Sequence, residues 1–203
     1  MIRRTRRPLR EPRLRFAVVA AAFRRAYYRP VSYPHKNIRL PTSHYIGQRF
    51  YFITLCCSGH RRVFASPKRA IQLIDELRVQ AASNRFAVHA YCVMPDHLHA
   101  LVFGLEPASN MLRFLKTLKQ KTAYEFQRKF NEPLWQKKFY DHILRPKDSP
   151  EAVAAYTWMN PARKGLCKTP NDYPFSGSFV FDDWRKTFSP RELWQPPWKD
   201  QLL

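Results

Sequence analysis

The apolar residues of this chain fall into short runs that predict four β-strands. The runs are rich in aromatic and β-branched side chains, which favour strands over helices. Pro95-Asp96 makes a tight break, so the second strand is expected to end there and the third to begin directly after it. The expected strands cover residues 49–57, 86–94, 97–103 and part of 135–145.

Other stretches place apolar side chains three and four residues apart, the spacing of one helix face. One such helix is expected to begin at Pro67, with the serine before it as N-cap. A longer helix is expected to open at Ser109 and to end before Asn131. A short third helix is expected over 150–160, closed by Pro161.

Without the last helix, the order of elements is β-α-β-β-α-β. This order predicts an α+β fold of the ferredoxin-like type, a four-stranded antiparallel sheet with two helices on one face. The additional C-terminal helix must lie beside that sheet. We expect the folded domain over 37–181, a basic arm over 1–36 and a Pro/Trp-rich tail over 182–203.

The chain carries a large positive charge. The chain has 203 residues, with 36 Lys+Arg against 15 Asp+Glu and a net charge of +21. Such an excess indicates a polyanionic partner, most often nucleic acid. No apolar run approaches the roughly 20 residues of a membrane-spanning helix, so no membrane partner is expected. The four cysteines lack C-x-x-C spacing, which favours reduced, buried thiols in a reducing cytosol. The expected location of the protein is the cytoplasm, in association with the nucleoid.

The charge is concentrated at the amino terminus. Residues 1–30 hold ten Arg and a single acid, a net +9, which leaves +12 for the other 173 residues. This arm has three interpretations. It is a flexible segment that contacts phosphates, a mitochondrial targeting segment, or a stretch that precedes the true start of translation.

Two histidines stand out inside an apolar strand. His97 and His99 are two residues apart, so in a strand they point to the same face. Two imidazoles side by side are a common metal-binding pair, although two half-exposed polar residues on an open sheet face are an alternative interpretation. Asp96 could hydrogen-bond a water beside them, or could simply be a turn residue.

A tyrosine and an asparagine form the second candidate constellation. Tyr156 and Asn160 are four residues apart and share one helix face, so a phenol and an amide could lie together. An amphipathic helix with a half-buried tyrosine and a capping asparagine is the alternative. Tyr124 and Tyr140 are rival candidates for a nucleophile, whereas His142 is expected to be structural.

Three segments together resemble the REP-associated tyrosine transposases of the single-tyrosine HUH superfamily, which is IS200-like. They are AYCVMPDHLHALV, LWQKKFYDHILR and AAYTWMNPARKGL, in that order, and the resemblance runs from about residue 37 to 181. It implies the ferredoxin-like fold, with His97 and His99 as metal ligands. It further implies Tyr156 as the nucleophile and Asn160 as the residue that completes the metal site.

The implied reaction is metal-dependent cleavage and rejoining of single-stranded DNA through a 5′-phosphotyrosine intermediate. Two imidazoles and one amide leave about three octahedral positions open, which suits Mg²⁺ or Mn²⁺. The family acts on palindromic hairpins, so hairpin DNA is the expected partner, bound by a monomer or a homodimer. The expected DNA-binding residues are Arg61, Arg62, Arg113, Lys116, Lys119, Lys121, Arg128, Lys137 and Lys138.

Two other functions stay open. A domesticated relative could bind hairpins without catalysis, although the presence of all four candidate site residues weighs against it. A metal-dependent hydrolase in which water attacks would form no tyrosine adduct. Cleavage assays with hairpin DNA and a divalent cation separate the three.

Overall fold

The structure is a computed structural model that describes residues 40–184. The expected basic arm, 1–36, lies outside the described residues, as does the tail after residue 184. Within residues 40–184, none of the helices combines the length and the apolar character that crossing a membrane requires.

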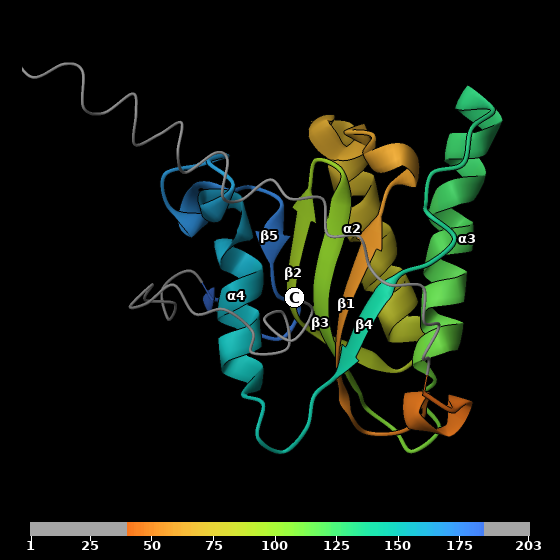
Figure 1. Cartoon of the computed structure of the whole chain (residues 1–203), viewed down its shortest axis with the longest axis vertical. Helices are drawn as coiled ribbons and strands as arrows, with labels where there is room; N and C mark the ends of the chain where they lie inside the picture. Colours follow the sequence, from red (N-terminus) through yellow and green to blue (C-terminus); the bar gives the residue numbers. More distant parts are fainter. Residues whose placement is uncertain (1–39, 185–203) are drawn as a thin grey trace, which may run out of the picture. The chain divides into compact units, whose positions relative to one another are not determined.

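Eight helices and strands build the described domain, apart from four short 3₁₀ turns (Figure 1). They are β1 (Phe50–Cys56), α2 (Pro67–Ser83), β2 (Phe86–Met94), β3 (His97–Gly104), α3 (Met111–Phe130), β4 (Tyr140–Ile143), α4 (Pro150–Arg163) and β5 (Ser176–Gly177). The β-α-β-β-α-β order predicted from the apolar pattern is thereby confirmed.

The sheet is antiparallel, with strand order β4-β1-β3-β2-β5. The fifth strand, β5, was not among the four that the apolar pattern predicted. β5 has two residues and pairs with Tyr91 and Cys92 of β2, which is too short to leave an alternating pattern in the sequence.

Successive residues of each strand point to opposite faces of the sheet, and this separates two cores. Tyr51 and Ile53 of β1 pack in the core that includes residues of α2 and α3. Phe52 packs on the other face with Val153 and Tyr156 of α4. In Figure 1, α4 stands apart from α2 and α3. The additional helix therefore covers the face that the two predicted helices leave open.

The register between β1 and β3 places the histidine pair on the α4 face. Thr54 lies opposite His99, and Cys56 lies opposite His97. Because paired residues in a sheet point to the same side, both histidines lie on the face of Phe52 and Thr54. The i, i+2 spacing predicted that the two histidines share one face of the sheet. The structure shows that this is the face that α4 covers.

Helix α4 continues three residues beyond its predicted end at Asn160. Its start is as predicted, because the Ser149 hydroxyl accepts a hydrogen bond from the Ala152 N–H at 3.1 Å. Pro161 has no N–H to donate to the Thr157 carbonyl. Asn160 Nδ2 donates to that carbonyl at 3.4 Å and to the Tyr156 carbonyl at 2.8 Å, and the helix passes through the proline to Arg163.

The other helix ends follow local chemistry. Asn110, not Ser109, caps α3, because its side chain accepts from the Arg113 N–H at 3.0 Å. The Ser109 hydroxyl donates instead to the carbonyl of Arg85. The predicted end of α3 before Asn131 is confirmed, and Asn131 itself adopts the left-handed conformation. The core on the α4 face extends to Trp184, the last described residue. Its ring is stacked on that of Trp158, with ring centroids 4.6 Å apart.

Candidate active site

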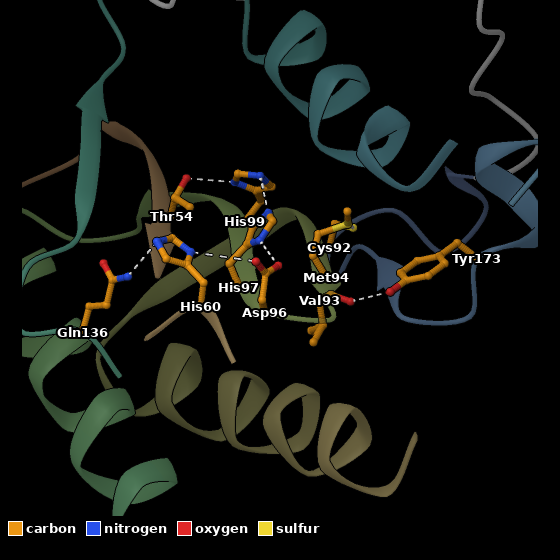
Figure 2. A network of polar contacts seen from close by, with 10 residues as sticks. All are labelled: Thr54, His60, Cys92, Val93, Met94, Asp96, His97, His99, Gln136 and Tyr173. Atoms are coloured by element: carbon orange, nitrogen blue, oxygen red, sulfur yellow. Dashed lines mark hydrogen bonds and ion pairs between the residues drawn. The ribbon is translucent and has the colours of Figure 1, made fainter. Parts of the chain in front are cut away.

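The two histidines of β3 converge through their Nε2 atoms. His97 Nε2 and His99 Nε2 are 3.0 Å apart, and the ring centroids are 4.6 Å apart at a steep angle (Figure 2). His99 is buried and His97 is half-buried. Two nitrogen lone pairs aimed at one point need a cation or a shared proton between them, because bare lone pairs repel each other.

Each histidine is held by a hydrogen bond at its other ring nitrogen. His97 Nδ1 lies 2.6 Å from Asp96 Oδ1, and His99 Nδ1 lies 2.8 Å from Thr54 Oγ1 (Figure 2). The hydrogen bond with His97 lowers the pKa of the Asp96 carboxyl below its usual value. Asp96 is therefore a carboxylate at neutral pH, and it accepts a hydrogen bond from the Nδ1–H group of His97. This arrangement turns both Nε2 atoms toward the same point.

The spacing of the two nitrogens fits a divalent cation. Ligands in neighbouring octahedral positions at about 2.1 Å from an ion are about 3.0 Å apart, and the two Nε2 atoms are 3.0 Å apart. Oxygen or nitrogen ligands on Mg²⁺ or Mn²⁺ leave other positions to water or phosphate. Within residues 40–184, no cluster of three His, Cys, Asp or Glu side chains is arranged to hold a metal. His97 and His99 fit as a two-ligand site, and the metal itself stays a prediction.

Tyr156 projects from α4 toward this pair. Its side chain is 3% exposed. Its ring centroid lies 6.3 Å from that of His99 and 5.9 Å from that of Phe52. Burial raises the pKa of the phenol above 10, although the positive charges of Arg163 and Lys164 oppose the shift. The phenol is therefore protonated at neutral pH, and it needs a proton acceptor to act as a nucleophile.

Asn160 is buried one turn after Tyr156. Besides its hydrogen bonds to the helix backbone, its side chain hydrogen-bonds Tyr156 and lowers the pKa of the phenol slightly against the effect of burial. The structure thus brings the predicted tyrosine and asparagine together on one face of α4, with the Tyr156 ring near that of His99. The role of Asn160 as a metal ligand stays a prediction.

Arg163 is a site residue that the sequence did not indicate. Its guanidinium carbon lies 4.8 Å from the centre of the Tyr156 ring. Its Nη1 atom is buried without a hydrogen-bond partner among the described residues. A buried N–H donor without an acceptor is costly, so this guanidinium is suited to an anionic ligand beside the phenol. The predicted helix end at Asn160 had left Arg163 outside α4.

Thr54 is a second residue that the sequence did not reveal. A threonine in a strand is common, and its hydroxyl gains significance only from the register that sets Thr54 opposite His99. The histidine pair alone indicates that a hydrogen-bond partner should lie near each ring. It does not indicate which residue provides that partner. Asp96 had been considered for a water contact, and it hydrogen-bonds His97 directly.

The rival tyrosines lie in different surroundings. Tyr124 is 63% exposed on α3, which packs on the other face of the sheet. Tyr140 of β4 lies on the α4 face, with its ring centroid 6.4 Å from Phe52. His142 Nε2 lies 3.0 Å from Asp148 Oδ2, a structural contact of the kind expected for this histidine.

Two of the predicted DNA-binding residues also stabilise the fold. Arg61 is ion-paired with Glu132 and donates to the backbone of Pro133 and Ser58. Lys119 Nζ donates to the carbonyls of residues 136 and 137 at 2.7 and 3.2 Å. The remaining predicted contacts are exposed, and their role stays a prediction; they are Arg62, Arg113, Lys116, Lys121, Arg128, Lys137 and Lys138.

With the geometry established, comparison with known proteins identifies the family. The model of the family described as "Transposase IS200 like" matches residues 47–156, more than half of the chain. The chain belongs to the IS200-like transposase family. The matched region contains both histidines and ends at Tyr156, so Asn160 and Arg163 lie just beyond it.

Two proteins of similar sequence are named as REP-associated tyrosine transposases. A candidate REP-associated tyrosine transposase of Haemophilus influenzae is 28% identical over 102 residues, which are 45% of this chain and 58% of that protein. The chain thus spans less than two thirds of this relative's length. The REP-associated tyrosine transposase of Escherichia coli is 22% identical over 134 residues, 66% of this chain and 78% of that protein.

A solved structure confirms the fold of this family member. The structure of a REP-associated tyrosine transposase bound to a REP hairpin superposes with a TM-score of 0.62 at 19% identity. The match covers 79% of this chain and 92% of the solved one. The predicted α+β architecture is therefore confirmed by an independent structure.

Proposed function

We propose that this IS200-like transposase cleaves and rejoins single-stranded DNA next to a hairpin, through a covalent link to Tyr156. The observation that carries the proposal is the convergence of His97 Nε2 and His99 Nε2 at 3.0 Å beside the Tyr156 ring. A cation site next to a phenol is the arrangement that phosphoryl transfer to tyrosine requires.

The reaction exchanges one phosphodiester bond for another and therefore needs no external energy source. The Tyr156 oxygen attacks the scissile phosphorus and forms a new P–O bond. The bond from phosphorus to the 3′ oxygen breaks, and the 3′ end leaves as a hydroxyl after taking up a proton. The DNA 5′ phosphate is then esterified to tyrosine, and attack by a 3′-hydroxyl reverses the step and rejoins the strand.

The chain's own residues prepare this step. His97 and His99, with Asn160 as the third proposed ligand, would hold Mg²⁺ or Mn²⁺, which supplies Lewis-acid polarisation of the phosphate when bound. Asp96 and Thr54 fix the ring orientations of the two histidines. Since burial raises the pKa of Tyr156, the phenol loses its proton during attack and not before it.

Arg163 is proposed to bind the same phosphate. Its buried Nη1 atom has no acceptor among the described residues, and its guanidinium lies over the phenol ring. A guanidinium at this place would hold a non-bridging phosphate oxygen and position phosphorus for in-line attack. The positive charge also favours the phenolate that forms as the proton leaves.

Hairpin DNA is proposed as the substrate because a protein of this fold was solved with a REP hairpin. The exposed lysines and arginines of α3 and the β1–α2 loop offer phosphate contacts for it.

Incubation with end-labelled hairpin DNA and Mn²⁺ tests the proposal. We expect a protein–DNA adduct that survives denaturation in the wild type and is absent in Tyr156→Phe. Cleavage that persists without an adduct in Tyr156→Phe would assign the reaction to water and contradict the proposal. Hairpin binding without cleavage in either protein would identify a binding protein instead.

A further inference from the structure

A cavity of about 320 Å³ lies between α2 and α3, on the side of the sheet that faces away from the histidine pair. Its size is that of a small-ligand pocket. It is lined by residues of both helices and by Val63, Phe64 and Leu134. No residue proposed for cleavage lines it, so it is separate from the candidate active site.

Four basic side chains line this groove. Lys68 and Arg69 come from the first turn of α2, and Lys121 and Lys129 come from one face of α3. None of the four forms an ion pair with an acid among residues 40–184, although two glutamates line the same groove. Cations that line one groove without an ion-paired carboxylate among the described residues favour a phosphate-bearing ligand.

Two aromatic rings lie between these charges. Phe126 and Phe130 of α3 pack with ring centroids 4.7 Å apart. The Arg69 guanidinium carbon lies 4.4 Å from the centre of the Phe130 ring and 5.5 Å from that of Phe126. Phe130 is 38% exposed at the C-terminal end of α3. The Arg69 guanidinium thus lies over the Phe130 ring, and this pair is named the Arg69–Phe130 platform; the Phe126 ring is tilted by 40° against that of Phe130.

We propose that this groove binds an unpaired segment of single-stranded nucleic acid. A base would stack on the Arg69–Phe130 platform, and the flanking phosphates would contact Lys68, Lys121 and Lys129. Duplex DNA fits less well, because its base faces are covered and only its backbone could reach the lysines. An acidic peptide would satisfy the charges but would leave the platform without a planar partner.

This inference goes beyond the proposed function, since a strand held here lies on the opposite side of the sheet from Tyr156. The groove would act as an anchor for a part of the strand that is not being cut. Among its basic residues, only Lys121 had been expected to contact DNA. The others gain this role because two antiparallel helices bring residues about sixty positions apart to one cavity.

The test measures binding of a fluorescent oligothymidine of about eight nucleotides to the full-length Tyr156→Phe protein without divalent metal. Phe130→Leu removes the ring at an exposed helix end, and Arg69→Gln removes the guanidinium. We expect each to weaken binding about tenfold, the usual effect of losing one stacked base. Phe130→Tyr keeps the ring and is expected to bind within about twofold of the parent. Ultraviolet cross-linking is expected to attach thymine to the peptide that contains residues 126–130.

Lys168→Gln is the charge-matched control, because Lys168 is exposed outside the groove. Equal losses in Lys168→Gln and Arg69→Gln would show diffuse attraction and overturn the proposal. Unchanged binding in Phe130→Leu, or equal competition by a duplex or by polyglutamate, would overturn it as well. Because the assay contains no metal and no nucleophile, absence of DNA cleavage in the wild type leaves this result unaffected.

Discussion

The hydrogen bond between Thr54 and His99 gives the sharpest test of the metal site. Thr54→Val replaces the hydroxyl by a methyl group of nearly the same size. His99 Nδ1 then loses the partner that lies 2.8 Å away, and its Nε2 is no longer held toward that of His97. The side chain is half-buried in a central strand, so the shape of the sheet is preserved.

The expected loss follows from the geometry. Removing a partner that orients a metal-binding histidine costs about 10- to 100-fold in metal affinity, or about 1.4 to 2.8 kcal/mol. The same hydrogen bond contributes only about 1 kcal/mol to folding, so the variant should stay folded. Metal affinity should therefore fall by more than the free energy of unfolding does.

Titration of the DNA-free protein with Mn²⁺, followed by electron paramagnetic resonance of the free ion, measures this affinity. Thr117→Val is the matched control. Its hydroxyl donates to the Phe114 carbonyl at 2.9 Å within α3, on the other side of the sheet. Wild-type Mn²⁺ affinity in Thr54→Val, or an equal loss in Thr117→Val, would refute the proposed role of the histidine pair.

Three further predictions follow from the same structure. Arg163→Gln should lower the cleavage rate about 100- to 1000-fold, and Arg163→Lys should recover part of it, as measured in single-turnover reactions with labelled hairpin; equal rates in all three proteins would exclude a phosphate contact. Because burial raises the pKa of Tyr156, the difference in tyrosinate absorbance between wild type and Tyr156→Phe should have its midpoint at a higher pH than free tyrosine does, and a midpoint at or below that of free tyrosine would contradict the buried phenol. Phe52→Ala should lower the free energy of unfolding by about 3 to 5 kcal/mol in urea, since Phe52 is fully buried against α4, whereas a loss under 1 kcal/mol would contradict that packing.

The arm gives a fifth prediction, based on charge alone. Deletion of residues 1–30 removes a net charge of +9. DNA binding should become weaker and less dependent on salt, because fewer counterions are released. The cleavage chemistry should remain, and its complete loss in a folded truncation would contradict the separation of arm and domain.

Local patterns predicted most of the fold. The run FAVHAYCVM predicted β2 at its observed bounds, 86–94, because its aromatic and β-branched side chains leave little choice of structure. The i, i+2 spacing of His97 and His99 and the i, i+4 spacing of Tyr156 and Asn160 correctly predicted shared faces. In each case the information lies within a few neighbouring residues.

Features that depend on distant residues were not predictable in this way. Thr54 belongs to the site only through the pairing of β1 with β3, and β5 exists only because β2 offers an edge. Arg163 reaches Tyr156 because the Asn160 side chain replaces the hydrogen bond that Pro161 cannot donate. The groove likewise requires the packing of α2 against α3.

The proposed reaction joins Tyr156 covalently to DNA. Its most direct test is mass spectrometry of the denatured adduct, after reaction with hairpin DNA and Mn²⁺ followed by nuclease and protease digestion. We expect a nucleotide 5′ phosphate on the peptide that contains Tyr156. A modified Tyr124 or Tyr140, or a cleaved hairpin with no modified tyrosine, would contradict it.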